Sequence, residues 1–287
     1  MLKESDFPLS IQIKILGRIV QINAIYKSLI QDILDFFSIN ENEPKFWGTP
    51  DVQLFINSKH MSRYMFRSRM KNQFLEHVYF CDGLDTKNLK KWEFLTPPLP
   101  PFESSGFKNQ LIAIHAGAIS DQNKAILFVG DRGSGKTTLT ISLANKLHYE
   151  YLTDETVVIQ RHTDYVYSFP RLVLTRTSAN IESVKNKYRA DKLVPKINKT
   201  GAQVSQIYFL NPTSSQPVGI FKITSLEAIL KLFESYRYIG TSIENSSSTL
   251  INLSEKECFR VSYTAGDFTS LKNAESLIYK NLIREQQ

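Results

Sequence analysis

The feature that most constrains this chain is a glycine-rich segment that ends in lysine and threonine. Residues 130–137 read Gly-Asp-Arg-Gly-Ser-Gly-Lys-Thr, which matches the phosphate-loop pattern Gly-x-x-x-x-Gly-Lys-Ser/Thr. An apolar run at residues 125–129 precedes the segment, and Leu139, Leu143 and Leu147 follow it at helical spacing. A strand that leads through such a loop into a helix is the context that phosphate binding requires, and the alternative is a glycine-rich turn without a ligand. The sequence therefore predicts an α/β fold.

The residues of this loop have separate expected roles toward a nucleoside triphosphate. Glycine lets backbone N–H groups surround the phosphates, and the following helix directs its positive N-terminal end at the same anion. We expect the amine of Lys136 to reach the β- and γ-phosphates and the hydroxyl of Thr137 to bind magnesium. The expected cofactors are ATP, or another nucleoside triphosphate, and Mg²⁺. The expected cofactor-binding residues are Gly130, Asp131, Arg132, Gly133, Ser134, Gly135, Lys136, Thr137 and Thr138.

Composition and cysteine usage indicate a globular protein of the cytoplasm. The chain has 287 residues, of which 42% are hydrophobic, enough for one large domain or two modest ones. No apolar run approaches the roughly 18 residues of a membrane span, and Lys3, Glu4 and Asp6 precede any apolar run, which argues against a signal peptide. Cys81 and Cys258 lie far apart without metal-ligand neighbours, so we expect buried or inert thiols and no disulfide.

The net charge of +7 has one local concentration in the first part of the chain. Aromatic and basic residues interleave there, at Arg63, Tyr64, Phe66, Arg67, Arg69 and Lys71. Such alternation is what a half-exposed strand shows, whereas nucleic-acid binding needs a continuous basic face. We favour the strand, and nucleic acid is not an expected partner.

A proline-rich stretch divides the chain into two expected domains. Residues 97–106 read Pro-Pro-Leu-Pro-Pro-Phe-Glu-Ser-Ser-Gly, and proline interrupts helices and strand pairing because it lacks the N–H and fixes φ. Residues 1–105 are expected to form a small α+β domain, and residues 106–287 a P-loop domain. In the first domain, strands are expected at residues 11–15, 52–56 and 78–81, and a helix at residues 29–37.

The second expected domain combines several short strands with two capped helices. Strands are expected at residues 111–115, 125–129, 149–153, 156–159 and 165–168, in a mixed rather than a purely parallel sheet. Thr224 and Glu227 form a capping box for a helix whose apolar residues are Leu226, Ile229 and Leu230. Asp267 is expected to cap a last helix over residues 271–283.

Binding a triphosphate does not separate a kinase from a GTPase or a motor, so the other motifs must discriminate. The chain has no Asn-Lys-x-Asp segment to bind guanine and no Leu-Ser-Gly-Gly-Gln segment of transporter ATPases. An acidic pair, Asp154 and Glu155, follows Thr137 by seventeen residues instead, at the end of the strand after the loop helix.

In this order of motifs the chain resembles the catalytic domain of HPr kinase/phosphorylase and its kinase-like relatives. The resemblance rests on His115-Ala-Gly, the phosphate loop, and Leu152-Thr-Asp-Glu-Thr-Val-Val-Ile159, and it extends over residues 107–287. Phe169-Pro-Arg171, Asp191-Lys192 and a strand at residues 259–263 before the final helix resemble the same relatives. HPr kinases usually have Asp where this chain has Glu155, and their Pro-Gly-Arg segment is missing here. These departures argue against HPr as the substrate and against the phosphorylase reaction. Relatives of this kind include kinases that phosphorylate a serine of a ribosomally made peptide, such as lasso-peptide precursors, and many members whose target is unknown.

The resemblance implies roles for the residues around the loop. Asp154 would accept the proton of the acceptor hydroxyl, and Glu155 would help Thr137 to hold the metal. Lys136 and His115 would stabilise the charge that develops during transfer, although a lone histidine is more often structural. Arg171, Arg176 and Lys192 are candidates for clamping a phosphate or a carboxylate. An acidic pair at a strand end can also be no more than a solvated turn.

The sequence thus predicts an ATP- and magnesium-dependent phosphotransferase that acts on a serine, or a similar hydroxyl, of a peptide or protein. Two alternatives stay open. One is a regulatory NTP-binding protein without a phosphorylated acceptor, and the other is a small-molecule kinase. The sequence is also compatible with a homo-oligomer.

Overall fold

The computed structural model describes residues 6–40, 48–57, 65–71, 73, 75–80, 90–91, 109–176, 185–213, 217–237, 239 and 243–284. The chain divides into two compact units, Met1–Gln110 and Leu111–Gln287. The proline-rich stretch and Cys81 lie outside the described residues. Within the described ranges, no helix combines the length and hydropathy needed to cross a bilayer.

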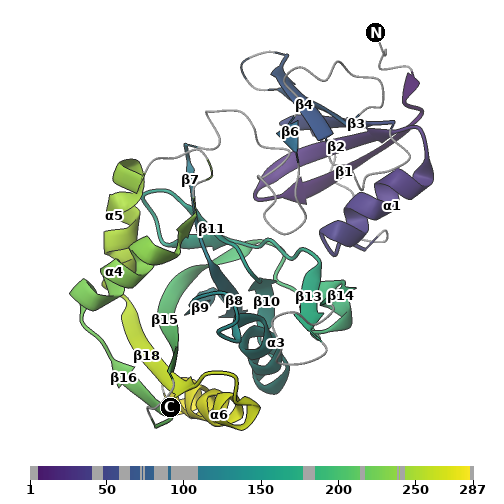
Figure 1. Cartoon of the computed structure of the whole chain (residues 1–287). Helices are drawn as coiled ribbons and strands as arrows, with labels where there is room; N and C mark the ends of the chain where they lie inside the picture. Colours follow the sequence, from purple (N-terminus) through teal and green to yellow (C-terminus); the bar gives the residue numbers. More distant parts are fainter. Residues whose placement is uncertain are drawn as a thin grey trace. The chain divides into compact units, whose positions relative to one another are not determined.

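The described residues of the first unit form a mixed sheet and helix α1 (Figure 1). The sheet order is β1-β2-β3-β5-β4-β6. The bounds are β1 (Leu9–Ile15), β2 (Arg18–Ala24), α1 (Lys27–Phe36), β3 (Val52–Ile56), β4 (Met65–Met70), β5 (Glu76–Phe80) and β6 (Lys90–Lys91). Helix α1 buries an apolar stripe of Leu29, Ile30, Ile33, Leu34 and Phe36. The basic segment around residue 67 includes β4, but its side chains before Met70 lie outside the described set.

The second unit is built on a large mixed sheet, as the sequence predicts. Its main path is β10-β8-β9-β15-β12-β11-β7-β17, and β18 pairs with β15 and β16. Strands β9, β15 and β18 are parallel to one another, whereas the other pairs are antiparallel. The bounds are β7 (Leu111–Ile114), β8 (Ala116–Asp121), β9 (Lys124–Val129), β10 (Glu150–Thr153), β11 (Val157–Gln160), β12 (Tyr165–Tyr167), β15 (Gly201–Thr213), β16 (Gly219–Lys222), β17 (Tyr236–Arg237) and β18 (Glu257–Thr264).

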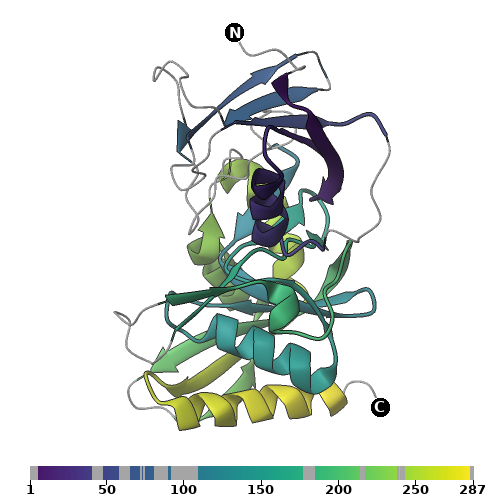
Figure 2. The same ribbon diagram turned by 90° about the vertical axis from the view of Figure 1, so that its right-hand side faces the viewer.

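Two pairs of helices cover the two faces of this sheet. Helices α3 (Lys136–Leu147) and α6 (Phe268–Arg284) run side by side over one face (Figure 2) and enclose one apolar core. Helices α4 (Ser225–Ser235) and α5 (Ile243–Ser254) cover the other face and enclose a second core. A separate hairpin, β13 (Val173–Arg176) with β14 (Lys185–Tyr188), precedes a short 3₁₀ turn at Ala190–Lys192. Cys258 is a free thiol in the second core, where burial raises its pKa to about 12.

The strand that pairs antiparallel with the loop strand β9 is β8, which was not predicted from the sequence. Strand β7 ends at Ile114 and pairs with β11 and β17, while β8 begins one residue after His115 and pairs with β9. The start of β8, Ala-Gly-Ala, lacks the β-branched residues that signal a strand. Its small residues are needed because α3 packs directly on them: a Cβ on Gly117 would lie 2.2 Å from Oγ1 of Thr140.

Helix α4 begins as expected but buries different residues. The hydroxyl of Thr224 accepts a hydrogen bond from the backbone N–H of Glu227, which confirms the predicted N-cap. The carboxylate of Glu227 accepts from Arg260 rather than completing the capping box. The expected apolar stripe is wrong in part, because Leu226 and Leu230 are 71% and 57% exposed. Ala228 and Leu232 face the core instead.

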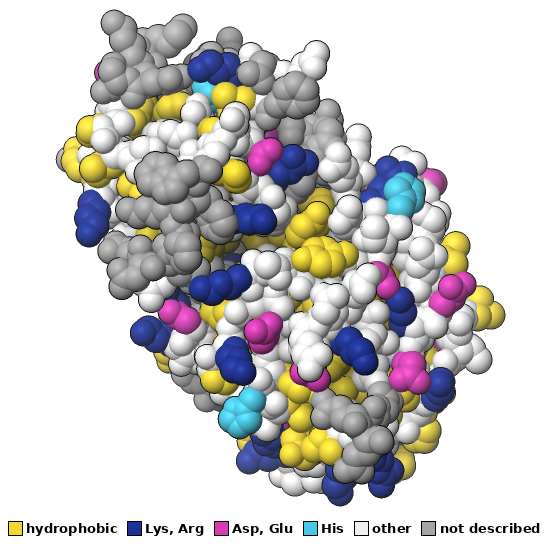
Figure 3. Space-filling view, turned by 180° about the vertical axis from the view of Figure 1, so that it is seen from behind, with side chains coloured by type: hydrophobic (Ala, Val, Ile, Leu, Met, Phe, Trp, Pro, Cys, Tyr) yellow, Lys and Arg dark blue, Asp and Glu magenta, His cyan; other side chains and the backbone are white. Residues whose placement is uncertain are grey.

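The surface of the molecule has charges of both signs. On the face in Figure 3, the Lys and Arg side chains of the described residues are interspersed with Asp, Glu and neutral side chains. On this face, the described residues form no basic band of the kind that follows a nucleic-acid backbone.

The exposure of Leu226 supplies a matched test of the core. We predict that Leu232→Ala lowers the free energy of unfolding by about 2–5 kcal/mol, because it removes a fully buried side chain and leaves a cavity. Leu226→Ala, in the same helix, should change it by less than about 0.5 kcal/mol. Urea unfolding of the two variants checks this, and equal effects would contradict the assigned orientation of α4.

Candidate functional site

The glycine-rich loop lies between β9 and α3, where its backbone is fixed from several sides. Gly135 has φ of 82°, a left-handed conformation that side chains disfavour, and a Cβ there would lie 3.0 Å from Leu271 of α6. The hydroxyl of Tyr263, in β18, donates a hydrogen bond to the backbone carbonyl of Ser134. The loop is therefore held by β18 and α6 as well as by the strand and helix that it joins.

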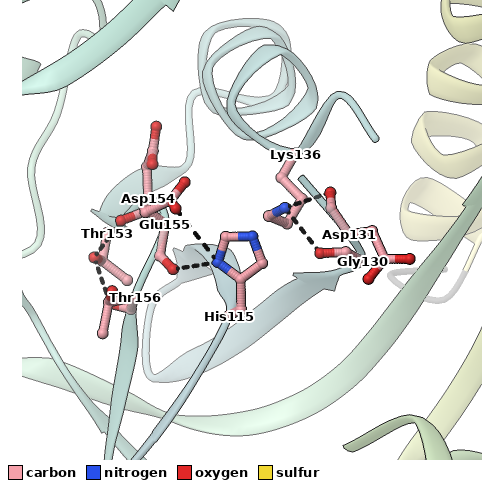
Figure 4. Close-up of polar contacts among 8 residues, drawn as sticks. All are labelled: His115, Gly130, Asp131, Lys136, Thr153, Asp154, Glu155 and Thr156. Carbon is pink, nitrogen blue, oxygen red and sulfur yellow. Dashed lines mark hydrogen bonds and ion pairs between the residues drawn. The ribbon is translucent and has the colours of Figure 1, made fainter. Parts of the chain in front are cut away.

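Lys136 lies inside the loop, with only 5% of its surface exposed. Its Nζ donates to the carbonyls of Gly130 and Asp131 at 2.8 and 2.9 Å (Figure 4). Burial lowers the pKa of this amine, while the carboxylates of Glu155, Asp154 and Asp131 act in the opposite direction. A cation that is already directed into the curve of the loop is suited to binding phosphate oxygens.

The carboxylate of Asp154 is next to the hydroxyl of Thr137, at the start of α3. Asp154 is 6% exposed, and burial raises its pKa. The guanidinium of Arg171 and the hydrogen bond from the Thr137 hydroxyl oppose that rise, because both favour the ionised carboxylate. A hydroxyl beside a carboxylate at the start of the loop helix is a donor set that suits Mg²⁺, which prefers oxygen ligands and takes others from phosphates.

Arg171 is buried beside Asp154. It is 4% exposed, and among the described residues its Nε and Nη1 atoms have no hydrogen-bond partner. The buried hydroxyl of Tyr151 also has no hydrogen-bond partner among the described residues. Burying guanidinium nitrogens without hydrogen-bond partners is costly, and the electrostatic attraction between Arg171 and Asp154 compensates part of this cost.

His115 lies between Lys136 and Glu155 (Figure 4). Its Nδ1 is 2.9 Å from the backbone carbonyl of Glu155 and 3.6 Å from the Glu155 carboxylate. Burial lowers the pKa of His115, and Lys136 adds to this, whereas Glu155 opposes it. In the neutral ring, Nδ1 must carry the proton because a carbonyl can only accept. Nε2 is then a buried acceptor, and it has no partner among the described residues.

The structure brings together six residues that the sequence singled out: His115, Lys136, Thr137, Asp154, Glu155 and Arg171. Arg132 and Thr138 are exposed at the loop, and Asp131 supplies a carbonyl to Lys136. The structure does not show the other candidate residues at this site. Asp191 pairs with Arg189 at 2.9 Å, Lys192 is exposed, and the side chain of Arg176 lies outside the described residues.

Sequence reasoning missed one residue of this site, Arg237 in β17. Its charge acts on both His115 and Lys136 and lowers the pKa of each. No motif marks it, because β17 has only two residues and reaches the site by pairing with β7.

The described residues contain no group of three or more His, Cys, Asp or Glu side chains that could hold a metal ion. Magnesium that binds together with a nucleotide typically uses one or two carboxylates, waters and phosphate oxygens, so the Thr137–Asp154 pair is sufficient for that type of site.

Comparisons with known proteins add little to this geometry. No protein-family model matches the chain, and no curated protein matches its sequence. Among solved structures, the Hpr(Ser) kinase/phosphatase from Coxiella burnetii is similar with a TM-score of 0.33 and 11% identity, over 61% of this chain and 99% of that chain.

The lowered pKa of His115 predicts a pH-dependent contribution to stability. Because the pKa in the folded state lies below the ordinary value of 6.5, the unfolded state binds more protons under about pH 6.5, and stability falls as the pH falls through this window. His115→Asn removes that contribution. The stability of the wild type relative to His115→Asn should therefore be larger at pH 7.5 than at pH 5.5 in urea unfolding. A pH-independent difference would show that the imidazole is not held neutral.

Proposed function

We propose that this chain is a kinase of the HPr-kinase type, which transfers the γ-phosphate of ATP, bound with Mg²⁺, to a serine hydroxyl of a peptide or protein. The observation that carries the proposal is the position of His115. A loop that only binds nucleotide needs Lys136 and Thr137, but a transferase also needs a group that can take the proton of the acceptor. A neutral imidazole with an unpartnered acceptor nitrogen, next to the loop lysine, supplies that group.

Each half of the site has a separate task in this proposal. On the metal side, the Thr137 hydroxyl and the Asp154 carboxylate would hold Mg²⁺, and the ion supplies charge neutralisation to the phosphates. The hydrogen bond between Asp154 and Thr137 supports a metal-binding role for Asp154. This role differs from that of proton acceptor, which the sequence resemblance implies for Asp154. On the acceptor side, Glu155 holds the Nδ1–H of His115 through its carbonyl.

The chemical step follows from this division. The serine oxygen attacks the γ-phosphorus, the new O–P bond forms, and the bond from the γ-phosphorus to the bridging oxygen of ADP breaks. The serine proton passes to Nε2 of His115. Lys136 binds the phosphates throughout, and its charge neutralises oxygens that become more negative as ADP leaves.

The experiment that tests the function follows the label of γ-³²P ATP. Purified full-length protein is mixed with labelled ATP, Mg²⁺ and two sets of candidate acceptors, serine-containing precursor peptides and small hydroxyl metabolites. The proposal expects label on peptide serine. Label on a metabolite would support a small-molecule kinase, and label only in free phosphate would support a regulatory NTPase. Either of these results would contradict a peptide kinase.

Two substitutions separate the two halves of the site. His115→Asn should lower the transfer rate by about two to four orders of magnitude, the range typical for losing a positioned acid or base, with little change in nucleotide affinity. Asp154→Asn should instead raise the Mg²⁺ concentration needed for half-maximal transfer, because an amide binds the ion less well than a carboxylate. Asp191→Asn, whose carboxylate pairs with Arg189, is the matched control.

The same two variants can also show that Asp154, and not His115, accepts the proton. If Asp154→Asn abolishes transfer without changing the Mg²⁺ requirement, and His115→Asn transfers at the wild-type rate, Asp154 is the proton acceptor.

A further inference from the structure

The site contains more positive charge on its acceptor side than the phosphate loop alone provides. Lys136 and Arg237 are both cations, and His115 lies close enough for the charge of each to lower its pKa. Among the described residues, the guanidinium of Arg237 makes no hydrogen bond or ion pair. Two carbonyls and the nearby carboxylates compensate the charge of Lys136 in part, whereas the charge of Arg237 has no such partner in the described part of the chain, so a bound anion would be attracted to Arg237.

The sheet register places Arg237 on the same face as His115. In the antiparallel pairing of β17 with β7, Tyr236 is opposite Ile114 and Arg237 is opposite Ala113. Tyr236 and Ile114 both pack in the core under α4 and α5. Side chains alternate along a strand, so Ala113, His115 and Arg237 belong to the opposite face.

The pairing also brings Arg237 within reach of the loop. The backbone N–H of His115 donates to the carbonyl of Ser235 at 2.7 Å, which continues the β7–β17 pairing up to His115. A diagonal neighbour on the next strand is within reach of a long side chain. The charge of Arg237 lowers the pKa of Lys136 as well as that of His115, so its guanidinium lies within electrostatic range of both side chains.

We propose that Arg237 is a catalytic residue that binds the phosphoryl group during its transfer, from the side opposite the phosphate loop. This inference rests on the proposed kinase function. The guanidinium would donate two hydrogen bonds to the non-bridging oxygens of the γ-phosphate, a geometry that suits its planar fork. Charge spreads over these oxygens as the bond to ADP breaks, so the contact strengthens in the transition state.

Arg171 does not fill this role. Its guanidinium is 4% exposed and acts on Asp154, on the metal side of the site, whereas Arg237 is exposed and acts on the acceptor side. An exposed cation beside the proton acceptor can reach the transferred group when both substrates are bound.

The test measures binding of magnesium ADP with and without aluminium fluoride, which mimics the transferred phosphoryl group, together with the rate of transfer from ATP. The variants are Arg237→Gln, which removes the charge, and Arg237→Lys, which keeps the charge without the fork. Arg284→Gln, at the far end of α6, is the control for a lost surface arginine. All are full-length proteins checked for a wild-type melting temperature.

The proposal predicts a specific pattern. Arg237→Gln should bind magnesium ADP within about twofold of wild type, but transfer should fall by about a thousandfold, the lower end of the range for an arginine at a transferring phosphoryl group. The aluminium fluoride complex should weaken by a similar factor. Arg237→Lys should retain part of both properties, and Arg284→Gln should retain all of them.

The other outcomes overturn the inference. Wild-type transfer and fluoride binding by Arg237→Gln would show that the arginine does not contact the phosphoryl group. Equal losses of ADP binding and ADP–aluminium fluoride binding would show that Arg237 contacts ADP and not the transferred phosphoryl group. A wild-type protein that binds neither ligand would overturn the kinase proposal, and the role of Arg237 with it.

Discussion

The site depends on the close packing of helix α3 against the sheet. Thr140 of α3 lies against Gly117 of β8, and Leu271 of α6 lies against Gly135 at the first turn of α3. A Cβ at Gly117 would clash with Thr140, and at Gly135 any other residue would be strained by the positive φ and crowded by Leu271. Because β8 follows His115 directly, the same packing fixes the histidine relative to Lys136 and Thr137. These two glycines thus help to position both the loop and His115.

The charges of the site are largely compensated by one another, with one exception. Lys136, Asp154 and Arg171 are each at most 6% exposed, and a buried ion without a partner costs several kcal/mol. The hydroxyl of Thr137 and the charges of Arg171 and Lys136 stabilise the negative charge of Asp154. Three carboxylates and two carbonyls stabilise the positive charge of Lys136. Positive charge remains on the acceptor side, at Arg237. In our proposal, this uncompensated charge is met by the transferred phosphate.

Local signals in the sequence predicted much of the second unit. The phosphate-loop pattern, the Thr224 cap and the runs that became β9 and β11 depend on neighbouring residues, so a single chain reveals them. Three features depend on long-range contacts and were not predicted. Strand β8 is rich in small residues because α3 packs on it, Leu226 is exposed because α4 rests on Ala228 and Leu232, and Arg237 reaches the site only through strand pairing.

Binding of a magnesium-bound triphosphate by Lys136 and its neighbours is tested most directly by the free energy of unfolding. Ligand that binds only the folded state should stabilise the wild type by about 2.7 kcal/mol at a hundredfold excess over its dissociation constant. Lys136→Ala should lose most of this stabilisation, whereas Lys280→Ala, an exposed lysine of α6, should keep it. If millimolar magnesium ATP does not change the unfolding of the wild type, the phosphate-loop assignment is contradicted.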